Sequence, residues 1–186
     1  MTPARVIKTK DTAGPVKHAG LPARFLLIAL SLLYIGEALY MARAKPLWYD
    51  ELLGLSIAQA PSWSALLQAL ERGFDINPPL YHVATRACVL LFGDGNIATR
   101  LPAIAGVLVL SLALYFFTVR RMPTIFGALA FTLPGVMAIR GFSVEARPYA
   151  MLLGFAGLVL VAYQGAAAGS AASRHGRTNP PPGDSR

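Results

Sequence analysis

The sequence predicts an all-α integral membrane protein with about five transmembrane helices. The first observation is composition, because 55% of the 186 residues are hydrophobic and 14% are charged, with a mean hydropathy of +0.51. A soluble domain of this length needs a more polar surface. The second observation is that apolar stretches recur along residues 25–163, and about 20 apolar residues suffice to cross a bilayer as a helix. We therefore expect a multi-pass protein of the cell (inner or plasma) membrane, without internal repeats.

Residues 1–24 are expected to form a basic cytoplasmic arm. Positive charge beside a first span orients the N-terminus towards the cytoplasm. The net charge of +8 does not indicate a nucleic-acid partner, because the basic residues form no single patch interleaved with aromatic residues. The only cysteine, Cys88, excludes an intramolecular disulfide. The basic residues of the arm are Arg5, Lys8, Lys10, Lys17 and Arg24.

The first span is predicted from Phe25 to Ala42, where the sequence is apolar apart from a few small or polar residues and Glu37. The alternative is a cleaved signal peptide, because Ala42-Arg43-Ala44 resembles a cleavage site. In both cases the chain after Ala44 lies on the outer side.

Residues 43–79 are expected to form the first outer loop, with two short amphipathic helices on the membrane surface. Ser62 is a suitable N-cap for the second helix, and the apolar residues after it recur every three or four positions. Trp63 is expected at the level of the lipid headgroups.

The remaining apolar stretches are expected to supply the other spans. Gly93-Asp94-Gly95-Asn96 predicts a turn, and the Gly/Ala/Ser-rich residues 164–186 predict a disordered polar tail because they lack hydrophobic periodicity. The expected spans are Leu80–Phe92, Leu101–Val119, Met122–Ile139 and Tyr149–Tyr163.

Asp50 and Glu51 are the first candidates for chemistry, because a carboxylate pair beside a bilayer requires water or a cationic partner. A carboxylate there can act as a general base on an acceptor hydroxyl, or Asp50 can bind a divalent metal ion. The alternative is a solvated loop start whose acids keep the segment out of the bilayer. Adjacent side chains point in different directions, so we expect the two acids to have different roles.

Three stretches of the sequence hold the remaining candidate substrate-binding residues. Asp75-Ile76-Asn77-Pro78-Pro79 predicts a rigid turn that holds Asp75 and Asn77 towards the same cavity as Asp50, with His82 about one helical turn further on. A planar guanidinium binds phosphate well, so Arg100 is a candidate phosphate contact, with a snorkelling interfacial arginine as the alternative. Glu145 and Arg147 form a second candidate acid–cation pair in the loop between two apolar segments, where an ordinary interfacial loop is the alternative.

Four short motifs occur in order through the apolar sequence: Trp-Tyr-Asp-Glu, Asn-Pro-Pro-Leu-Tyr, Arg-Leu-Pro-Ala and Glu-Ala-Arg-Pro-Tyr. Together they resemble the N-terminal part of the GT-C membrane glycosyltransferases. The most similar group is that of the dolichyl-phosphate-mannose–protein mannosyltransferases and their bacterial relatives, including the lipid A aminoarabinose transferase. The resemblance covers about residues 25–163.

The resemblance implies transfer of a sugar from a polyprenyl-phosphate donor to a lipid, glycan or protein acceptor on the outer face, usually with inversion. Asp50 matches the family's catalytic acid, which acts as a base on the acceptor, and Glu51 is its neighbour. Asn77 stands where relatives contact the donor phosphate, often with a lysine. Arg100 matches an arginine before the third span, and Glu145 approximates an acid of the second loop.

Family members have longer membrane domains, so we expect a truncated or frame-shifted form of a longer protein. If all segments between Pro79 and Glu145 cross the membrane, Glu145 lies opposite Asp50; either one segment is re-entrant or Glu145 is not part of the site. The alternative function is a non-enzymatic multi-span membrane protein, an inactive fragment or a subunit, and a small transporter is a third hypothesis. No cofactor besides the metal ion is expected.

Overall fold

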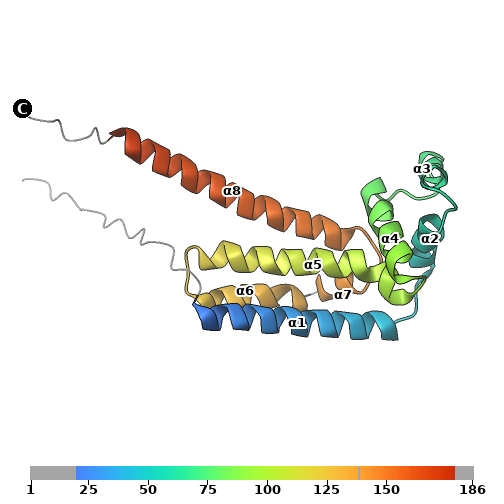
Figure 1. The fold of residues 1–186 in the computed structure, drawn as a ribbon, viewed down its shortest axis with the longest axis horizontal. Coiled ribbons are helices and arrows are strands. Elements are labelled where there is room, and N and C mark those ends of the chain that lie inside the picture. Colours follow the sequence, from blue (N-terminus) through green and yellow to red (C-terminus); the bar gives the residue numbers. More distant parts are fainter. Residues whose placement is uncertain (1–19, 138, 179–186) are drawn as a thin grey trace, which may run out of the picture.

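The computed structural model describes residues 20–137 and 139–178, and within these ranges the regular elements are all α-helices. Four helices lie side by side along the molecule, and three further helices gather at one end (Figure 1). The side-by-side set consists of α1 (Leu21–Ala44), α5 (Asn96–Val119), α6 (Thr124–Val136) and α8 (Tyr149–Thr178). The end group consists of α2 (Tyr49–Ala58), α3 (Trp63–Glu71) and α4 (Pro79–Phe92), and α7 (Ile139–Ser143) leads from α6 towards it.

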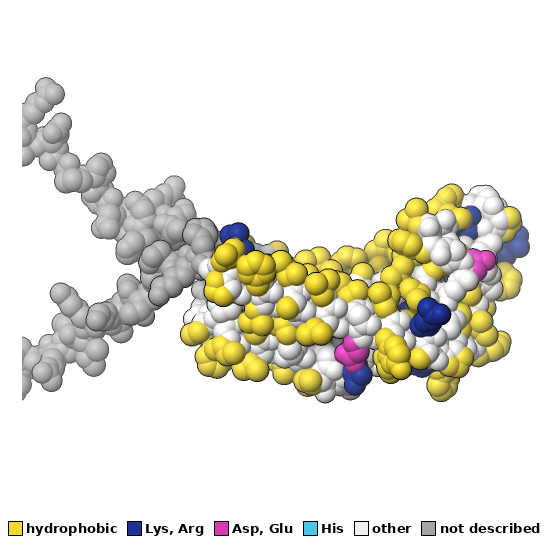
Figure 2. All heavy atoms as spheres, turned by 60° about the horizontal axis from the view of Figure 1, so that its bottom comes forward, with side chains coloured by type: hydrophobic (Ala, Val, Ile, Leu, Met, Phe, Trp, Pro, Cys, Tyr) yellow, Lys and Arg dark blue, Asp and Glu magenta, His cyan; other side chains and the backbone are white. Residues whose placement is uncertain are grey.

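Three of these helices are long and apolar enough to cross a membrane: α1, α5 and the Tyr149–Ser170 part of α8. Large hydrophobic side chains are exposed along them, and Figure 2 shows hydrophobic side chains spread over the length of one face. The all-helical class is therefore confirmed, and the apolar helices support a membrane protein. The expected count of five spans stays a prediction, because the other two candidates, α4 and α6, have 14 and 13 residues.

Helix α5 is the centre of the bundle, where it contacts α1, α4, α6, α7 and α8. Its approach to α8 is a backbone-to-backbone contact. A Cβ added at Gly106 would overlap the backbone of Ala150, and one added at Gly154 would lie 2.7 Å from the carbonyl oxygen of Gly106. Small residues at such a crossing are typical of helix packing in membranes. They fix the position of the chain that enters α8.

The two short helices expected in the first outer loop are present as α2 and α3. The predicted N-cap is also present, because Ala65 N donates to Ser62 Oγ at 3.1 Å. Arg86 on α4 fixes the link between the two helices: its Nη1 donates to the carbonyl of Ala58 at 2.9 Å, and its guanidinium lies 4.8 Å from the ring centroid of Trp63. The loop is therefore held against α4.

The end of the chain differs from the predicted disordered tail at 164–186. Helix α8 continues to Thr178, so the predicted tail is helical as far as that residue. The physical reason is the alanine content of Gly165–Ser170 and beyond, since alanine has the highest helix propensity and needs no hydrophobic periodicity to be helical. The basic arm up to residue 19 and residues 179–186 lie outside the described residues.

Candidate functional site

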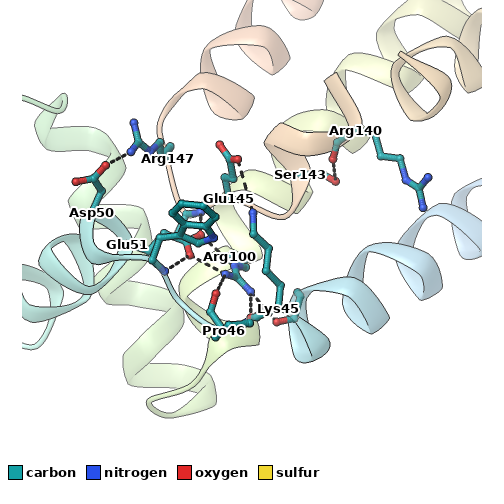
Figure 3. A network of polar contacts seen from close by, with 12 residues as sticks. Lys45, Pro46, Asp50, Glu51, Arg100, Arg140, Ser143, Glu145 and Arg147 are labelled. Carbon is teal, nitrogen blue, oxygen red and sulfur yellow. Dashed lines mark hydrogen bonds and ion pairs between the residues drawn. The ribbon is translucent and has the colours of Figure 1, made fainter. Parts of the chain in front are cut away.

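A buried ion pair between Glu51 and Arg100 forms the base of the candidate site (Figure 3). Arg100 Nη2 lies 2.6 Å from Glu51 Oε2, and Arg100 Nε donates to Oε1 at 3.1 Å. Glu51 is 1% exposed and Arg100 is fully buried. A buried pair of this kind is sustained only when its remaining hydrogen-bonding groups also have partners.

Those partners come from two stretches of chain, residues 42–48 at the end of α1 and before α2, and the loop before α8. Arg100 Nη1 donates to the carbonyls of Ala42 at 2.8 Å and Lys45 at 2.6 Å, where α1 ends, and Nη2 donates to the carbonyl of Pro46 at 3.0 Å. The carboxylate of Glu51 accepts hydrogen bonds from the backbone N–H groups of Trp48 at 2.9 Å and Ala146 at 2.6 Å. The pair therefore joins α1, α2, α5 and the loop before α8.

Glu51 is ionised at neutral pH in this environment. Burial alone would raise the pKa of its carboxyl group, but the hydrogen bonds from Arg100, Ala146 and Trp48 and the positive charge of Arg100 outweigh burial. The pKa therefore lies below its ordinary value. Because every oxygen of Glu51 already faces a protein donor, the geometry favours a positioning role over the predicted catalytic role.

Asp50 has the opposite environment and forms an exposed ion pair with Arg147. The side chain of Asp50 is 59% exposed and that of Arg147 is 36% exposed. Figure 3 shows the two side chains facing each other, one from the start of α2 and the other from the loop that enters α8. The structure thus brings together two predicted site residues that are 97 positions apart in the sequence.

Glu145 lies at the same end of the bundle, where its carboxylate is 3.6 Å from Lys45 Nζ. Asp50 and Glu145 therefore lie at the same end of the bundle, and α4 lies across that end (Figure 1). Helix α5 therefore starts beside α2, and α6 returns the chain to the same end.

Asp75, Asn77 and His82 form a separate cluster at the start of α4. The Asp75 carboxylate accepts hydrogen bonds from Asn77 N at 3.1 Å and Asn77 Nδ2 at 3.0 Å, and the Nε2 of buried His82 lies 3.3 Å from it. Within the described residues, no hydrogen bond or ion pair joins this cluster to Asp50 or Arg147. The predicted proximity to Asp50 is thus not seen as a direct contact.

Two adjoining clefts connect the cluster with the loop before α8. The first, of about 330 Å³, lies between Asn77–Tyr81 and Pro148–Phe155, and its lining begins at the residue after Arg147 in the sequence. The second, of about 500 Å³, lies between α4, α5 and α8 and is lined almost entirely by apolar side chains. Met151 and Phe155 line both clefts, which together lead from the charged end into the bundle.

The environments of the predicted residues limit what they can do. Arg100 does not fit a phosphate contact, because its guanidinium is buried and donates to protein carbonyls and Glu51. Arg147 and Lys45 are partly exposed cations paired with Asp50 and Glu145 at this end. The sequence does not predict the roles of Lys45 and the Ala146 N–H. Lys45 is flanked by Ala44 and Pro46 and belongs to none of the motifs, and every residue except proline has a backbone N–H, so this donor cannot be recognised from sequence.

The donor set around Asp50 does not fit a metal held by the protein alone. Its carboxylate faces the cationic Arg147, and the described residues contain no group of three or more His, Cys, Asp or Glu side chains placed to hold a metal ion. We assign no step to a metal.

Comparison with protein-family models gives no match, and no curated protein and no solved structure matches the chain. The resemblance to GT-C glycosyltransferases therefore stays a prediction that rests on the four sequence motifs.

Proposed function

We propose that the chain transfers a sugar from a polyprenyl-phosphate donor to an acceptor hydroxyl at the end of the bundle that carries α2, α3 and α4. The observation that carries the proposal is the pairing of exposed Asp50 with exposed Arg147 above the buried Glu51–Arg100 pair. A fixed frame with an accessible carboxylate and an accessible guanidinium is the arrangement that this transfer requires. Lys45 adds a second cation nearby.

Asp50 acts as the general base in this reaction. It takes the proton of the acceptor hydroxyl while the acceptor oxygen forms a bond to the anomeric carbon of the sugar. The bond between that carbon and the phosphate oxygen breaks, and polyprenyl phosphate leaves with the bonding electrons. Attack from the face opposite the leaving group inverts the anomeric centre.

Arg147 stabilises the negative charge that develops on the leaving phosphate. A guanidinium donates two parallel hydrogen bonds to phosphate oxygens, which a lysine cannot reproduce. Because Arg147 is paired with Asp50 in the free protein, the arriving phosphate competes for the guanidinium and releases the carboxylate for its role as base.

The apolar clefts support a lipid-linked donor. The cleft beside Arg147 and the apolar cleft that adjoins it lead from a phosphate at the mouth along α8. They can receive the first isoprene units of the donor. We propose that α1, α5, α8 and the combined α6–α7 segment cross the bilayer, while α4 lies at the interface. This arrangement places the loop with Asp50 and the loop with Arg147 on the same side of the membrane.

The experiment that tests this function uses the full chain in liposomes with a labelled polyprenyl-phosphate sugar and a mixture of glycan, lipid and peptide acceptors. Asp50→Asn is expected to lower transfer by about 10²–10⁴-fold while donor binding and membrane insertion persist, because only the proton acceptor is lost. Arg147→Gln is expected to weaken donor binding as well. Arg121→Gln, at the opposite end of α5, is the matched control and leaves both unchanged. Undiminished transfer by Asp50→Asn contradicts the assignment.

The alternative is a non-enzymatic membrane protein in which Asp50–Arg147 only ties α2 to the loop before α8. The ion pair itself favours this alternative, because each charge is already balanced by the other. Donor binding by the wild-type chain without any turnover supports it.

A further inference from the structure

A second charged pair lies on the side of the bundle, away from the candidate site. Glu37 on α1 forms an ion pair with Arg140 on α7. The two side chains are 46% and 55% exposed. Figure 3 shows Arg140 lying apart from the cluster around Glu51 and extending towards α1. The pair is thus a separate feature of the lateral surface.

The surface around this pair is apolar. Leu33 and Tyr40 lie four residues before and three residues after Glu37, on the same face of α1, and both are exposed. Val136 and Met137, at the end of α6, are exposed as well. Glu37 lies seven residues before the end of α1, about 10 Å along the helix axis. The pair therefore opens towards lipid, within two helical turns of the end of a candidate span.

The two charges do not satisfy each other fully. A guanidinium carries five N–H donors and a carboxylate accepts at both oxygens. Within the described residues, Arg140 Nη2 contacts Glu37 Oε1, and neither charged group makes a hydrogen bond to a third residue. Unsatisfied donors and acceptors facing hydrocarbon are costly, so these groups require a polar partner from outside the chain.

There is room for such a partner on both sides of the pair. A cleft of about 290 Å³ lies between α1 and α7, and a cleft of about 370 Å³ lies between α1, α5 and α6. Tyr34, Glu37 and Gly135 line both clefts, and Arg140 lines the first. The combined space is polar at the charged pair and apolar beyond it, which suits an amphipathic molecule.

We propose that Glu37 and Arg140 bind the headgroup of a bilayer phospholipid that carries both a phosphate and a primary ammonium group. Arg140 donates to the phosphate, and Glu37 accepts from the ammonium. The site has no net charge, so a zwitterionic headgroup matches it, whereas an anionic headgroup would leave Glu37 without a cation. A choline headgroup has no N–H donor for Glu37. Local thinning of the bilayer at a polar cleft lets a headgroup reach this level.

This inference does not depend on the proposed sugar transfer. It depends on the location of α1 in a bilayer, which the length and composition of that helix support.

The test measures lipid retention by the full chain in nanodiscs that contain equal amounts of phosphatidylethanolamine, phosphatidylcholine and phosphatidylglycerol with identical acyl chains. Native mass spectrometry of the released protein counts the bound lipids. The wild-type chain is expected to retain phosphatidylethanolamine at least about tenfold over the other two, which corresponds to one charge-assisted hydrogen bond. Equal retention of the three lipids overturns the proposal.

Two variants separate headgroup binding from a structural role of the ion pair. Arg140→Gln is expected to abolish the preference, while Arg121→Gln, which removes a distant arginine, leaves it intact. Glu37→Gln leaves Arg140 alone at the site, so the preference is expected to change to phosphatidylglycerol. A misfolded chain cannot produce that change of preference. An unaltered phosphatidylethanolamine preference in either Glu37→Gln or Arg140→Gln overturns the proposal.

Discussion

Asp50 and Glu51 are neighbours in the sequence with opposite environments. Successive residues of a helix point about 100° apart, so at the start of α2 one acid faces the bundle and the other faces outwards. Glu51 is enclosed by Arg100 and two backbone N–H groups, whereas Asp50 meets only the exposed Arg147. The same chemical group is thus a buried structural anchor at Glu51 and, at Asp50, the accessible carboxylate to which we assign the role of base in the proposed function.

We expect Glu51→Gln to destabilise the protein much more than Asp50→Asn. Neutralising Glu51 leaves Arg100 as a buried charge without its counter-ion, which costs about 3–5 kcal/mol. Neutralising Asp50 removes an exposed ion pair, which contributes about 0–1 kcal/mol. Chemical denaturation in mixed micelles measures both free energies of unfolding. Equal losses for the two variants would show that the buried pair does not hold the site together.

The stability contributed by Glu51 is expected to depend on pH. The folded-state pKa of Glu51 lies below its unfolded value of about 4.3, so its contribution is complete above that value and is lost as the pH falls through the folded pKa. The difference in free energy of unfolding between the wild type and Glu51→Gln should therefore be constant near neutral pH and shrink below about pH 4. Denaturation curves near neutral pH and at successively lower pH values measure it, and a difference that does not shrink as the pH falls contradicts the assignment.

At the scale of elements, the crossing of α5 and α8 depends on glycine. We expect Gly106→Ala to destabilise the protein by about 1–3 kcal/mol, because the new Cβ overlaps the backbone of Ala150 and the two helices must separate. Gly36→Ala in α1 is the control. A Cβ at Gly36 meets nothing within 4 Å, so that change is expected to be neutral or stabilising through helix propensity. Thermal unfolding in detergent measures the stability change of each variant. If both substitutions destabilise the protein, or both stabilise it, the packing explanation is contradicted.

Helix α4 shows what an apolar pattern can and cannot predict. The pattern marks its bounds within one residue, but hydropathy alone also suggests that it crosses the membrane. Tertiary contacts decide its placement: Arg86 is tied to the loop between α2 and α3, and His82 lies against Asp75. In the local sequence, the packing of α4 at the end of the bundle is indicated only by its polar side chains, His82 at the start of the helix and Arg86 at its centre, which are buried in the structure.

For the whole molecule, the start of α1 and the end of α8 lie at one end of the bundle, and the turn between α4 and α5 lies at the other (Figure 1). On a Cys88→Ala background, single cysteines at Gly20 and Ser170 should react with impermeant reagents from the same side, and a cysteine at Asp94 from the opposite side. With the basic arm in the cytoplasm, Asp94→Cys reacts in intact cells. If the cysteines of Ser170→Cys and Asp94→Cys react with the reagent from the same side of the membrane, this arrangement is contradicted.

The sequence predicts the helices and the chemical types of the site residues better than it predicts their partners. Hydropathy and capping residues are local properties, so α1, α3 with its Ser62 cap, and α5 follow from short stretches of sequence. The pairing of Glu51 with Arg100 spans 49 positions, and that of Asp50 with Arg147 spans 97. Only the packing of the bundle selects these partners from the other charges available. The helical end of α8 was missed because alanine forms helix without periodicity.

The order in which the chain is synthesised decides when the Ala146 N–H can donate its hydrogen bond to Glu51. Residue 146 leaves the ribosome 95 residues after Glu51, which is roughly 5–20 s at ordinary rates of synthesis. During this interval the carboxylate lacks its last donor, and before Arg100 emerges it lacks its counter-ion as well. The contact that joins the first loop to the chain before α8 can therefore form only after residue 146 has emerged.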